Sequence, residues 1–269
     1  MHKTERQDEI LAILKKNKYA SVQDLGTALY ASQPTIRRDL ASLEAAGYVM
    51  RSHGGVILRD ERIDTPVAFR SSTKTHQKML ISHAAASLIG DSRTVFIDAS
   101  TTASYIAGDI RSCEKLMVVT NSLRVAEELA DGAPEVWCTG GRDLRTSLAF
   151  VGNQSIRCVS DFCVDIAFFS SSALGSDGVI QDSSPEETEI RRTVLRSAAK
   201  KVFLCDSSKF GQTSPFRVCA ITEVDCIITD TPLPPDIRTS DAFTLAEKDG
   251  ACLYRRRKDS GNSNASGQR

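Results

Sequence analysis

Two arginines and several small side chains are spaced as they would be on a DNA-reading helix. At about 100° per residue, Ile36, Leu40 and Leu43 share one side of a helical wheel and are expected to be buried. The outward side carries Thr35, Arg38, Ala41, Ser42 and Ala45, with Arg37 at the border. Small side chains let a helix approach the major groove closely, and arginine bonds guanine bidentately or clamps a phosphate. The pattern therefore predicts contact with DNA.

The first turns of this helix and a following hairpin supply the remaining candidate contacts. Recognition helices usually touch base edges with their first turns, and a hairpin beside the DNA backbone adds phosphate contacts. The candidate DNA-binding residues are Ser32, Gln33, Thr35, Arg37, Arg38, Ser42, Arg51 and His53. The alternative is a generic three-helix packing module with a solvated charged face, because residues 1–57 carry eight Lys and Arg against six Asp and Glu, an excess of only two.

Polar residues end several apolar runs in the rest of the chain. They are Asp98, Thr120, Thr139, Ser170, Asp206 and Asp230, and each closes a short strand-like run. If the strands are parallel, these residues meet at one edge of a sheet, which is where open α/β sheets bind their ligands. The spacing therefore predicts a second binding site, built from strand ends.

Three helices and a hairpin must position the DNA-reading residues. Apolar spacing predicts a first helix over about 4–17, Ser21 can cap a second helix, and Pro34 lies just inside a third, where its missing N–H group has no helical partner. A Gly-Gly pair at 54–55 supplies the positive φ angles that a tight hairpin needs. Residues 1–58 are thus predicted to form a winged helix-turn-helix domain.

The polar residues that end the apolar runs are expected to lie in a second domain of a different architecture. Residues 59–75 are charged and polar and are predicted to be a linker. From about residue 76, near-continuously apolar runs alternate with helical stretches, the pattern of a mostly parallel sheet with helices on both faces. The predicted fold class is α/β: a winged helix-turn-helix domain joined to a Rossmann-like effector-binding and oligomerisation domain over 76–254. The polar residues 255–269 are expected to be a disordered tail.

Composition limits the class of protein. The 269 residues are 41% hydrophobic and 25% charged, with 34 Lys and Arg against 34 Asp and Glu, so affinity for nucleic acid must come from a local surface. No apolar run approaches the roughly 18 residues of a membrane span, and the start is too charged for a signal peptide, so we expect a cytoplasmic protein. Eight cysteines without a CxxC pair predict no metal site, and Cys138, Cys205 and Cys226 are expected to be reduced core thiols.

The N-terminal motifs resemble those of a known family. The run Thr35-Ile36-Arg37-Arg38-Asp39-Leu40, followed by Leu43, Gly47 and Arg51-Ser52-His53-Gly54-Gly55, is similar to the DNA-binding head of the DeoR family of bacterial transcription regulators. Pro34 departs from the small or acidic residue more usual there. The resemblance implies binding to a double-stranded operator, most often as a homo-oligomer.

The resemblance extends to about residue 230. Matching segments are Phe69-Arg70, Lys78, Asp98-Ala99-Ser100-Thr101-Thr102, Thr120-Asn121-Ser122, Gly140-Gly141, Gly152, Pro185-Glu186-Glu187 and Asp206-Ser207-Ser208-Lys209-Phe210-Gly211. The family's effector domain is similar to ribose-5-phosphate isomerases and CoA transferases, and it typically binds phosphorylated sugars that release repressors from DNA. Ala99-Ser100 and Phe169-Ser170 depart from the family pattern, so Ser170, Ser171 and Ser172 are expected to line the pocket.

This resemblance implies a set of effector-binding residues. They are Asp98, Ser100, Thr101, Thr102, Asn121, Ser122, Gly140, Gly141, Arg142, Glu187 and Lys209. Hydroxyls and free helix N–H groups can hold phosphate, Arg142 and Lys209 can pair with it, and carboxylates can accept hydrogen bonds from sugar hydroxyls. Taken singly, the same residues are explained as helix caps, turns or solvated surface groups.

The expected function is therefore a transcriptional repressor of carbohydrate-metabolism genes, released from its operator by a small phosphorylated metabolite. We expect a dimer or tetramer, without a cofactor, a metal or a membrane contact, and not an enzyme. One alternative is a sugar-phosphate isomerase with a DNA-binding head, in which Asp98, Glu187 and Lys209 act as acids and bases. Another is a regulator whose pocket has lost its effector and serves only oligomerisation.

Overall fold

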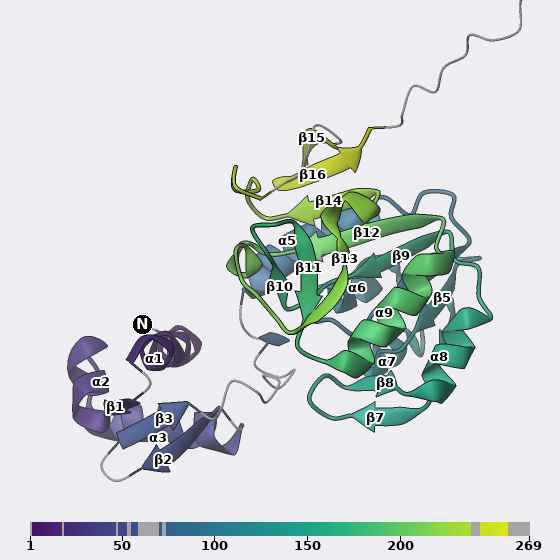
Figure 1. The fold of residues 1–269 in the computed structure, drawn as a ribbon. Coiled ribbons are helices and arrows are strands. Elements are labelled where there is room, and N and C mark those ends of the chain that lie inside the picture. Colours follow the sequence, from purple (N-terminus) through teal and green to yellow (C-terminus); the bar gives the residue numbers. More distant parts are fainter. Residues whose placement is uncertain are drawn as a thin grey trace, which may run out of the picture.

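The computed structural model describes residues 2–17, 19–46, 48–52, 55–58, 70–71, 74–237 and 243–257. The first 58 residues contain the three predicted helices: α1 (Lys3–Asn17), α2 (Val22–Ala28) and α3 (Gln33–Ala45). The predicted hairpin is formed by β2 (Val49–Ser52) and β3 (Gly55–Leu58), and an unpredicted strand, β1 (Tyr19–Ser21), pairs with β3. This unit is a winged helix-turn-helix domain (Figure 1).

The winged helix-turn-helix domain forms because its apolar spacing buries one stripe of each helix. Ile36, Leu40 and Leu43 of α3 pack with residues of α1, α2 and the sheet in one hydrophobic cluster. The hydroxyl of Ser21 accepts a hydrogen bond from the Asp24 N–H group, and the Asp24 carboxylate returns one, which is a complete capping box for α2. Gly47, expected to end α3, lies outside the described residues.

The second domain is built on an eight-stranded sheet in the order β15-β16-β14-β12-β9-β4-β5-β6. Its parallel strands are β4 (Thr94–Ile97), β5 (Met117–Thr120), β6 (Glu135–Cys138), β9 (Ile166–Phe169), β12 (Lys200–Cys205) and β14 (Cys226–Thr229). Counted along the chain, these strands have the order 3-2-1-4-5-6 of a Rossmann-like sheet. The predicted fold class is confirmed.

Helices cover both faces of this sheet (Figure 1). One face carries α5 (Thr75–Ala86), α6 (Ile106–Ile110) and α7 (Leu123–Leu129), and the other carries α8 (Asn153–Ser160) and α9 (Pro185–Ser197). Neighbouring residues of each strand point to opposite faces: Val95 and Ile97 join one hydrophobic cluster, whereas Phe96 joins the other. Burial on both faces explains why the strands are almost continuously apolar.

Smaller elements complete the domain. A second sheet contains β10 (Ala173–Leu174), β11 (Val179–Asp182) and β13 (Phe216–Ala220), and β7 (Arg142–Leu144) pairs with β8 (Ala149–Val151). Short 3-10 helices are η1 (Ala103–Tyr105), η2 (Ser207–Lys209) and η3 (Ile221–Glu223). These elements were not predicted, because they are short and lack a clear apolar period.

The C-terminal end of the sheet extends beyond the predicted domain. Strands β15 (Phe243–Lys248) and β16 (Ala251–Arg256) form an antiparallel hairpin on β14. Arg255 and Arg256 therefore belong to the sheet and not to the predicted tail, and residues 258–269 lie outside the described part of the chain. The boundaries of the linker remain a prediction, since residues 59–69 are not described.

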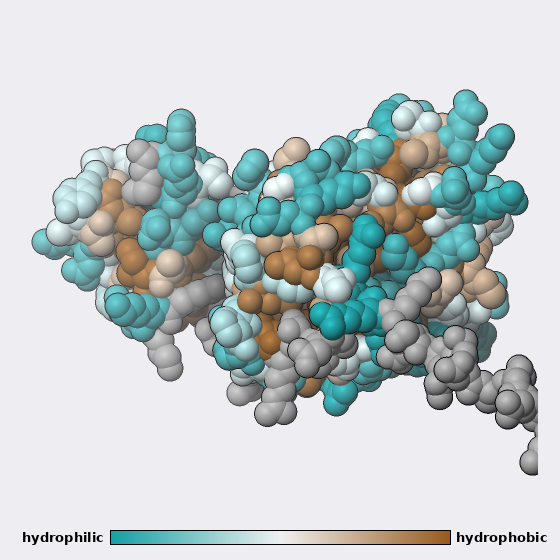
Figure 2. All heavy atoms as spheres, turned by 90° about the horizontal axis from the view of Figure 1, so that it is seen from above, coloured by the Kyte–Doolittle hydropathy of each residue, from teal (hydrophilic) through white to brown (hydrophobic). Residues whose placement is uncertain are grey.

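The surface is mostly polar, with hydrophobic patches between polar groups (Figure 2). Cys205 and Cys226 are buried as predicted, but the prediction for Cys138 is wrong: this residue is exposed, and it lies on β6, the edge strand of the sheet. Among the helices that the structure describes, none is long and apolar enough to cross a membrane.

Candidate functional site

Helix α3 presents most of the predicted DNA-binding residues on its outer side. Gln33, Arg37 and Arg38 are exposed, Thr35 and Ser42 are half-buried, and the Ser32 and Thr35 hydroxyls lie 2.9 Å apart in a hydrogen bond. The two guanidinium groups therefore extend from a helix whose opposite side is fully buried. A surface of this kind can enter the major groove and pair with guanine or phosphate.

A buried ion pair fixes α3 against α1. Asp39 is 1% exposed, and its Oδ2 atom lies 2.5 Å from Nε of Arg6. Sequence reasoning placed Asp39 in a motif but gave it no role. Its position two residues after Arg37, between Ile36 and Leu40, is the signal that this carboxylate lies on the inner side of the helix.

The predicted wing contacts are partly described. Arg51 of β2 pairs with Glu44 of α3, with Nε 2.9 Å from Oε2, and both side chains remain about half exposed. Such an exposed pair contributes little to stability, so Arg51 can exchange Glu44 for a phosphate at small cost. His53, also predicted to bind DNA, lies outside the described residues.

In the second domain, the order of the parallel strands reverses between β4 and β9, and polar residues follow both strands. Asp98 comes directly after β4 and Ser170 directly after β9. The Asp98 N–H group donates to the Phe168 carbonyl at 3.1 Å, and the Ser170 N–H group donates to the Asp98 carboxylate at 3.3 Å. A reversal of this kind is where doubly wound sheets bind their ligands, so the site predicted from strand ends has a definite location.

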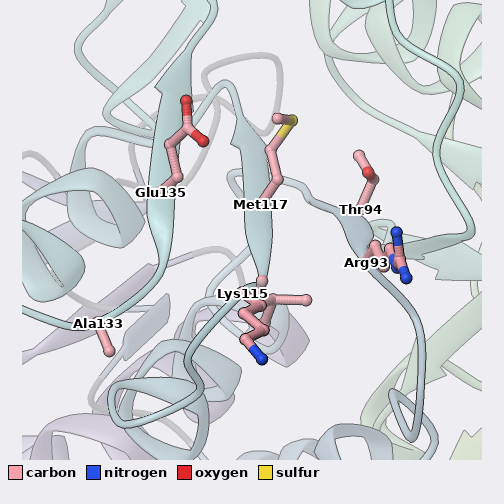
Figure 3. A pocket seen from close by; sticks show the side chains of 7 residues that line it. Arg93, Thr94, Lys115, Met117, Ala133 and Glu135 are labelled. Atoms are coloured by element: carbon pink, nitrogen blue, oxygen red, sulfur yellow. The ribbon is translucent and has the colours of Figure 1, made fainter.

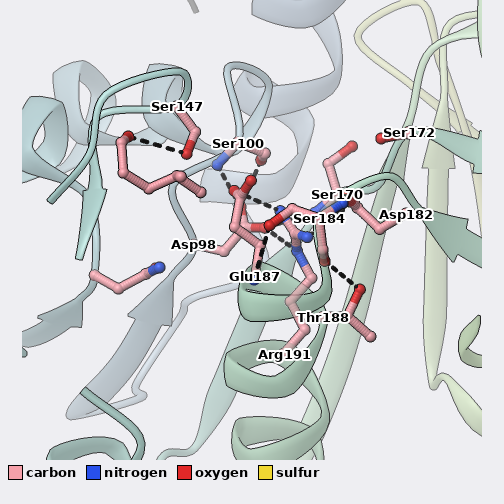
Figure 4. Close-up of polar contacts among 12 residues, drawn as sticks. Asp98, Ser100, Ser147, Ser170, Ser172, Asp182, Ser184, Glu187, Thr188 and Arg191 are labelled. Carbon is pink, nitrogen blue, oxygen red and sulfur yellow. Dashed lines mark hydrogen bonds and ion pairs between the residues drawn. The ribbon is translucent and has the colours of Figure 1, made fainter. Parts of the chain in front are cut away.

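A buried arginine gathers three carboxylates at this location (Figure 4). Nε of Arg191 lies 2.8 Å from Asp98 Oδ2, and its Nη1 lies 2.8 Å from Asp182 Oδ2. Its Nη2 lies 3.3 Å from Glu187 Oε1, one turn earlier on α9. The four side chains are each no more than 6% exposed. We refer to Asp98, Asp182, Glu187 and Arg191 as the acidic cluster.

The acidic cluster contains more negative than positive groups. Three carboxylates face one guanidinium, and the pKa of Arg191 is raised by Asp182, Asp98 and Glu187, although burial opposes this. Burial, with the charges of Asp182 and Asp98, raises the pKa of Glu187 to about 7, despite Arg191 and Arg70. Glu187 can therefore accept hydrogen bonds when ionised and donate one when protonated.

Sequence reasoning predicted Asp98 and Glu187 but missed Asp182 and Arg191. A cation on a helix face that is otherwise apolar, between Ile190 and Val194, was a usable signal for a buried ion pair. Asp182 gave no such signal, because it ends a short strand that periodicity did not detect.

The loop after β4 holds its hydroxyls in different environments. The Ser100 hydroxyl donates to Asp98 and accepts from the Ala103 N–H group, so it stabilises the turn. Thr101 is 5% exposed, and Thr102 is fully buried. The Thr102 Oγ1 atom has no hydrogen-bond partner among the described residues. A buried hydroxyl without a partner costs free energy and is available to a ligand or a water.

Asn121 and Ser122 at the end of β5 also differ from each other. The Ser122 hydroxyl accepts from the Val125 N–H group at 3.3 Å and so caps α7, which is the structural alternative to a ligand contact. Asn121 Nδ2 donates to the Phe150 carbonyl, whereas its buried Oδ1 atom has no partner within the described part of the chain. Of the two, Asn121 is the better candidate for a ligand.

Gly140 and Gly141 have positive φ angles of 62° and 113°. A Cβ atom on Gly141 would lie 2.5 Å from Ser155 Oγ and 2.7 Å from the Val151 carbonyl. Protein atoms thus fill the space that we expected a ligand to approach, and the glycine is required for packing against α8. Arg142 is exposed and pairs with Glu186 at 2.7 Å, at the start of α9.

Lys209 lies at the site, at the end of η2. Its Nζ atom donates to the Ser170 hydroxyl at 2.7 Å and is 3.5 Å from Asp206. Lys209, with Ser208, lowers the pKa of the Asp206 carboxyl against the effect of burial. Lys78 of α5 is 5% exposed, and burial together with the charge of Lys209 lowers its pKa to about 8, although Asp206 opposes this. Lys78 was a matching position in the sequence but not a predicted ligand.

The predicted effector residues thus fall into three groups. Thr101, Thr102 and Asn121 are buried, and the Thr102 Oγ1 and Asn121 Oδ1 atoms have no partner among the described residues. Asp98, Ser100, Glu187 and Lys209 meet around Ser170 and Arg191. Ser122, Gly140, Gly141 and Arg142 make contacts within neighbouring elements instead. Among the described residues, no group of three or more His, Cys, Asp or Glu is placed to hold a metal ion.

A hollow of about 370 Å³ lies at the opposite edge of the sheet (Figure 3). Its lining includes Arg93, Lys115 and Glu135, at the amino ends of β4, β5 and β6. None of the predicted residues lines it. Buried charges, and the Thr102 Oγ1 and Asn121 Oδ1 atoms without a partner among the described residues, mark the carboxyl edge, so that edge and not this hollow is the candidate site.

Comparison with known proteins gives results for both domains. The family model for the DeoR-like helix-turn-helix domain matches residues 6–62, and the model for the DeoR C terminal sensor domain matches residues 73–231. The chain is 29% identical over 238 residues to the glycerol-3-phosphate regulon repressor of Escherichia coli (strain K12), covering 88% of this chain and 94% of that one. It is 31% identical over 231 residues to the HTH-type transcriptional regulator GolR of Listeria innocua, covering 85% and 91%.

Solved structures also show some likeness. A ribose 5-phosphate isomerase from Methanocaldococcus jannaschii has 16% identity and a TM-score of 0.39, covering 51% of this chain and 55% of that one. A score of this size carries no argument about function.

Proposed function

The chain belongs to the DeoR family of transcriptional regulators, and on that premise we propose that it represses carbohydrate-metabolism genes and is released from its operator by a phosphorylated metabolite. Helix α3 and the wing would bind the operator. The carboxyl edge of the sheet would bind the metabolite. We further propose that the protein acts in the cytoplasm as a dimer or tetramer, because helix-turn-helix proteins usually bind paired half-sites.

The observation that carries the proposal is that one chain has two sites, each with charged groups that match a different ligand: DNA for one, and a small phosphorylated molecule for the other. Arg37 and Arg38 are exposed on a helix fixed from behind by Arg6 and Asp39, which suits a polyanion. The effector site combines buried carboxylates with Lys209, which suits a ligand carrying both hydroxyls and an anionic group. The name of the Escherichia coli relative refers to glycerol-3-phosphate, a molecule with both kinds of group.

We propose sensing and not catalysis at this site. Both carboxylates that an isomerase would use as acid or base, Asp98 and Glu187, are held by Arg191. The Arg191 guanidinium lies 2.8 Å from Asp98 Oδ2, so a substrate would have to displace it to reach that oxygen atom. Assays of the purified protein with pentose and hexose phosphates should therefore show no turnover, and turnover that disappears in Glu187→Gln would favour the isomerase alternative.

The test of DNA recognition is binding to the control region of the protein's own gene. We expect specific binding that weakens steeply with salt, because phosphate contacts release counterions. Arg37→Ala and Arg38→Ala should each weaken binding by about 1–3 kcal/mol with an unchanged melting curve. Arg157→Ala, which removes an exposed arginine of α8, is the matched control and should bind like the wild type.

Two results would contradict the proposed DNA contacts. Wild-type affinity in both α3 variants would remove the recognition surface. Equal affinity for operator and for unrelated DNA would leave a non-specific DNA-binding protein and not a repressor.

A further inference from the structure

The turn between α2 and α3 contains a tyrosine in an unusual backbone conformation (Figure 1). Tyr30 has a φ angle of 50°, in the left-handed region that favours glycine. Bulky side chains rarely adopt this conformation, because it brings the Cβ atom too close to a backbone carbonyl oxygen. A glycine at this position would avoid the cost, so the presence of tyrosine needs another explanation.

The residues on either side of Tyr30 explain why the chain turns there. Leu29 is 8% exposed and belongs to the hydrophobic cluster of the DNA-binding domain, and Ala31 packs against that cluster. The Ala31 N–H group donates to the Gly26 carbonyl at 3.0 Å, so the turn is held against α2. Because both neighbours face inward, Tyr30 faces outward, and the fold fixes its place.

The Tyr30 side chain contributes no packing to the fold. It is 99% exposed, and no other residue in the described part of the chain hydrogen-bonds its hydroxyl group. Aromatic side chains usually stabilise a protein by being buried. Tyr30 therefore combines a backbone cost with a side chain that stays in the solvent. Residues of this kind cluster where a protein binds a ligand, because function and not stability retains them.

Tyr30 lies next to the part of α3 that is expected to enter the major groove. Ser32 is the residue before this helix, Gln33 is its first residue, and both are exposed. Two residues of extended chain span at most about 7 Å, so the Tyr30 Cα atom is no farther than this from that of Ser32. The major groove is about 12 Å wide and is bordered by phosphates. Tyr30 is thus placed at the border of the groove when the start of α3 lies inside it.

A phenol hydroxyl group suits a place beside phosphates. It is an uncharged donor that can bond a phosphate oxygen, and tyrosine is among the side chains that contact the DNA backbone. Its rigid ring carries the hydroxyl group well away from the turn. The exposed hydroxyl group of Tyr30 is therefore a donor without a partner in the described part of the chain, on a surface where a polyanion is expected.

We propose that Tyr30 binds a phosphate of the DNA backbone through its hydroxyl group, beside the point where α3 enters the major groove. The proposal rests on the proposed function, because it adds a contact to the same DNA-binding surface. A backbone contact carries no sequence information, so Tyr30 positions α3 on the duplex and does not read bases. The left-handed conformation is retained because it directs the side chain out of the turn toward the DNA.

Tyr30→Phe removes the hydroxyl group and leaves the backbone as it is. We expect the full chain to bind DNA about tenfold more weakly, because a hydrogen bond to a charged group is lost. The factor should be the same on the control region of the protein's own gene and on an unrelated duplex, since a phosphate contact does not depend on sequence. The melting curve should match that of the wild type.

The dependence of binding on salt identifies the kind of contact. The logarithm of the binding constant falls linearly with the logarithm of the salt concentration, with a slope set by the number of phosphates that cations neutralise. Tyr30→Phe should keep the wild-type slope, because it removes no cation. Fluorescence anisotropy of a labelled duplex at several salt concentrations measures this slope. A slope less steep by about one unit would show that a cation had moved, and would overturn the proposed contact.

Tyr30→Gly separates DNA binding from stability. Glycine adopts a positive φ angle without strain, so circular dichroism should show the helices of the DNA-binding domain melting a few degrees higher. The same variant should bind DNA about tenfold more weakly than the wild type. Lys115→Gly is the matched control, because Lys115 is also exposed, has a φ angle of 63° and lies in the effector domain. Its affinity for DNA should equal that of the wild type.

The remaining outcomes distinguish this proposal from the proposed function. Wild-type affinity in Tyr30→Phe, with weakened binding in Arg37→Ala, would remove Tyr30 from the DNA-binding surface and leave the proposed function intact. A loss seen only on the control region would make Tyr30 a base contact and overturn the phosphate assignment. A lower melting temperature in Tyr30→Gly would show that Tyr30 serves the fold. A wild-type chain that binds neither duplex would overturn both proposals.

Discussion

The two domains each bury an arginine against carboxylates, but with a different balance of charge. In the DNA-binding domain, Arg6 pairs with the carboxylate of Asp39. In the effector domain, Arg191 meets Asp98, Asp182 and Glu187 at once. The first pair is neutral and joins two helices. The second cluster has three carboxylates for one guanidinium, and Lys209 lies close to it through Ser170. The Arg6–Asp39 pair therefore has a structural role, whereas the charge of the acidic cluster can change when a ligand or a proton binds.

The same contrast holds at the surfaces where ligands are expected. Arg37 and Arg38 extend outward, ready for a polyanion. In the effector domain, Asp98, Glu187 and Lys209 are already bound to other protein groups. DNA therefore meets a preformed surface, whereas an effector must displace internal partners. Because binding of an effector must break contacts within the effector domain, it can change the conformation of that domain.

Removal of Arg191 should have the largest effect. Arg191→Met leaves three buried carboxylates without their cation, which should cost about 3–5 kcal/mol of unfolding free energy. The single tryptophan, Trp137, lies on β6, so its fluorescence reports unfolding of the effector domain alone. Arg192→Met, at the exposed neighbouring arginine, is the matched control. Equal unfolding midpoints for the two variants would show that the stability of the effector domain does not depend on the ion pairs of Arg191.

Asp39→Ala should destabilise the DNA-binding domain by about 3 kcal/mol, because it removes the buried carboxylate that pairs with Arg6. Circular dichroism should show earlier loss of helix signal while the Trp137 fluorescence transition stays unchanged. Glu44→Ala breaks the exposed pair with the Arg51 side chain and an exposed hydrogen bond from the Arg51 N–H group, and should cost about 1 kcal/mol or less. A joint shift of both signals would mean that the two domains unfold as one unit.

The stability of the effector domain should depend on pH through Glu187 of the acidic cluster. Burial raises the pKa of Glu187 from 4.5 to about 7, so the folded state favours its protonated form. The resulting stabilisation, about 3 kcal/mol, is fully present below about pH 4.5 and is lost as the pH rises through about 7. Glu187→Gln should flatten this fall in Trp137-detected stability, and Glu189→Gln should not. A fall of equal size in both variants would contradict the assignment.

The smallest expected effect concerns the start of α2. Ser21→Ala removes one side of the capping box and should cost about 1 kcal/mol of stability in the DNA-binding domain. Ser32→Ala is the control, since the Ser32 hydroxyl makes no hydrogen bond to the α3 backbone, and its effect on helix stability should be close to zero. Equal losses would show that the DNA-binding domain does not depend on this cap.

The sequence alone was enough for the main architecture, because apolar periods of 3.6 and near-continuous apolar runs are local signals. The three helices, the hairpin and the strands β4, β5, β6, β9, β12 and β14 all follow from such runs. The hairpin of β15 and β16 was missed, since exposed residues alternate weakly along it and the polar tail begins beside it. Short strands such as β10 and β11 have too few residues to show a period.

The candidate site could be predicted only in outline. Strand ends indicated Asp98, Ser170 and Asp206 correctly as residues of one sheet edge. The partners that decide their charge, Arg191 and Lys78, come from helices on opposite faces of the sheet, and no spacing in the chain announces that they converge. Contacts of this kind depend on how helices pack and not on local sequence.

The most direct test of the central claim is to add phosphorylated metabolites to the protein bound to the control region of its own gene. We predict specific binding that one phosphorylated sugar or polyol relieves, while its unphosphorylated form does not. Lys78→Met should keep operator binding and lose the response to the metabolite. Specific binding that no phosphorylated metabolite alters, or equal relief by the unphosphorylated form, would contradict the account of the effector site.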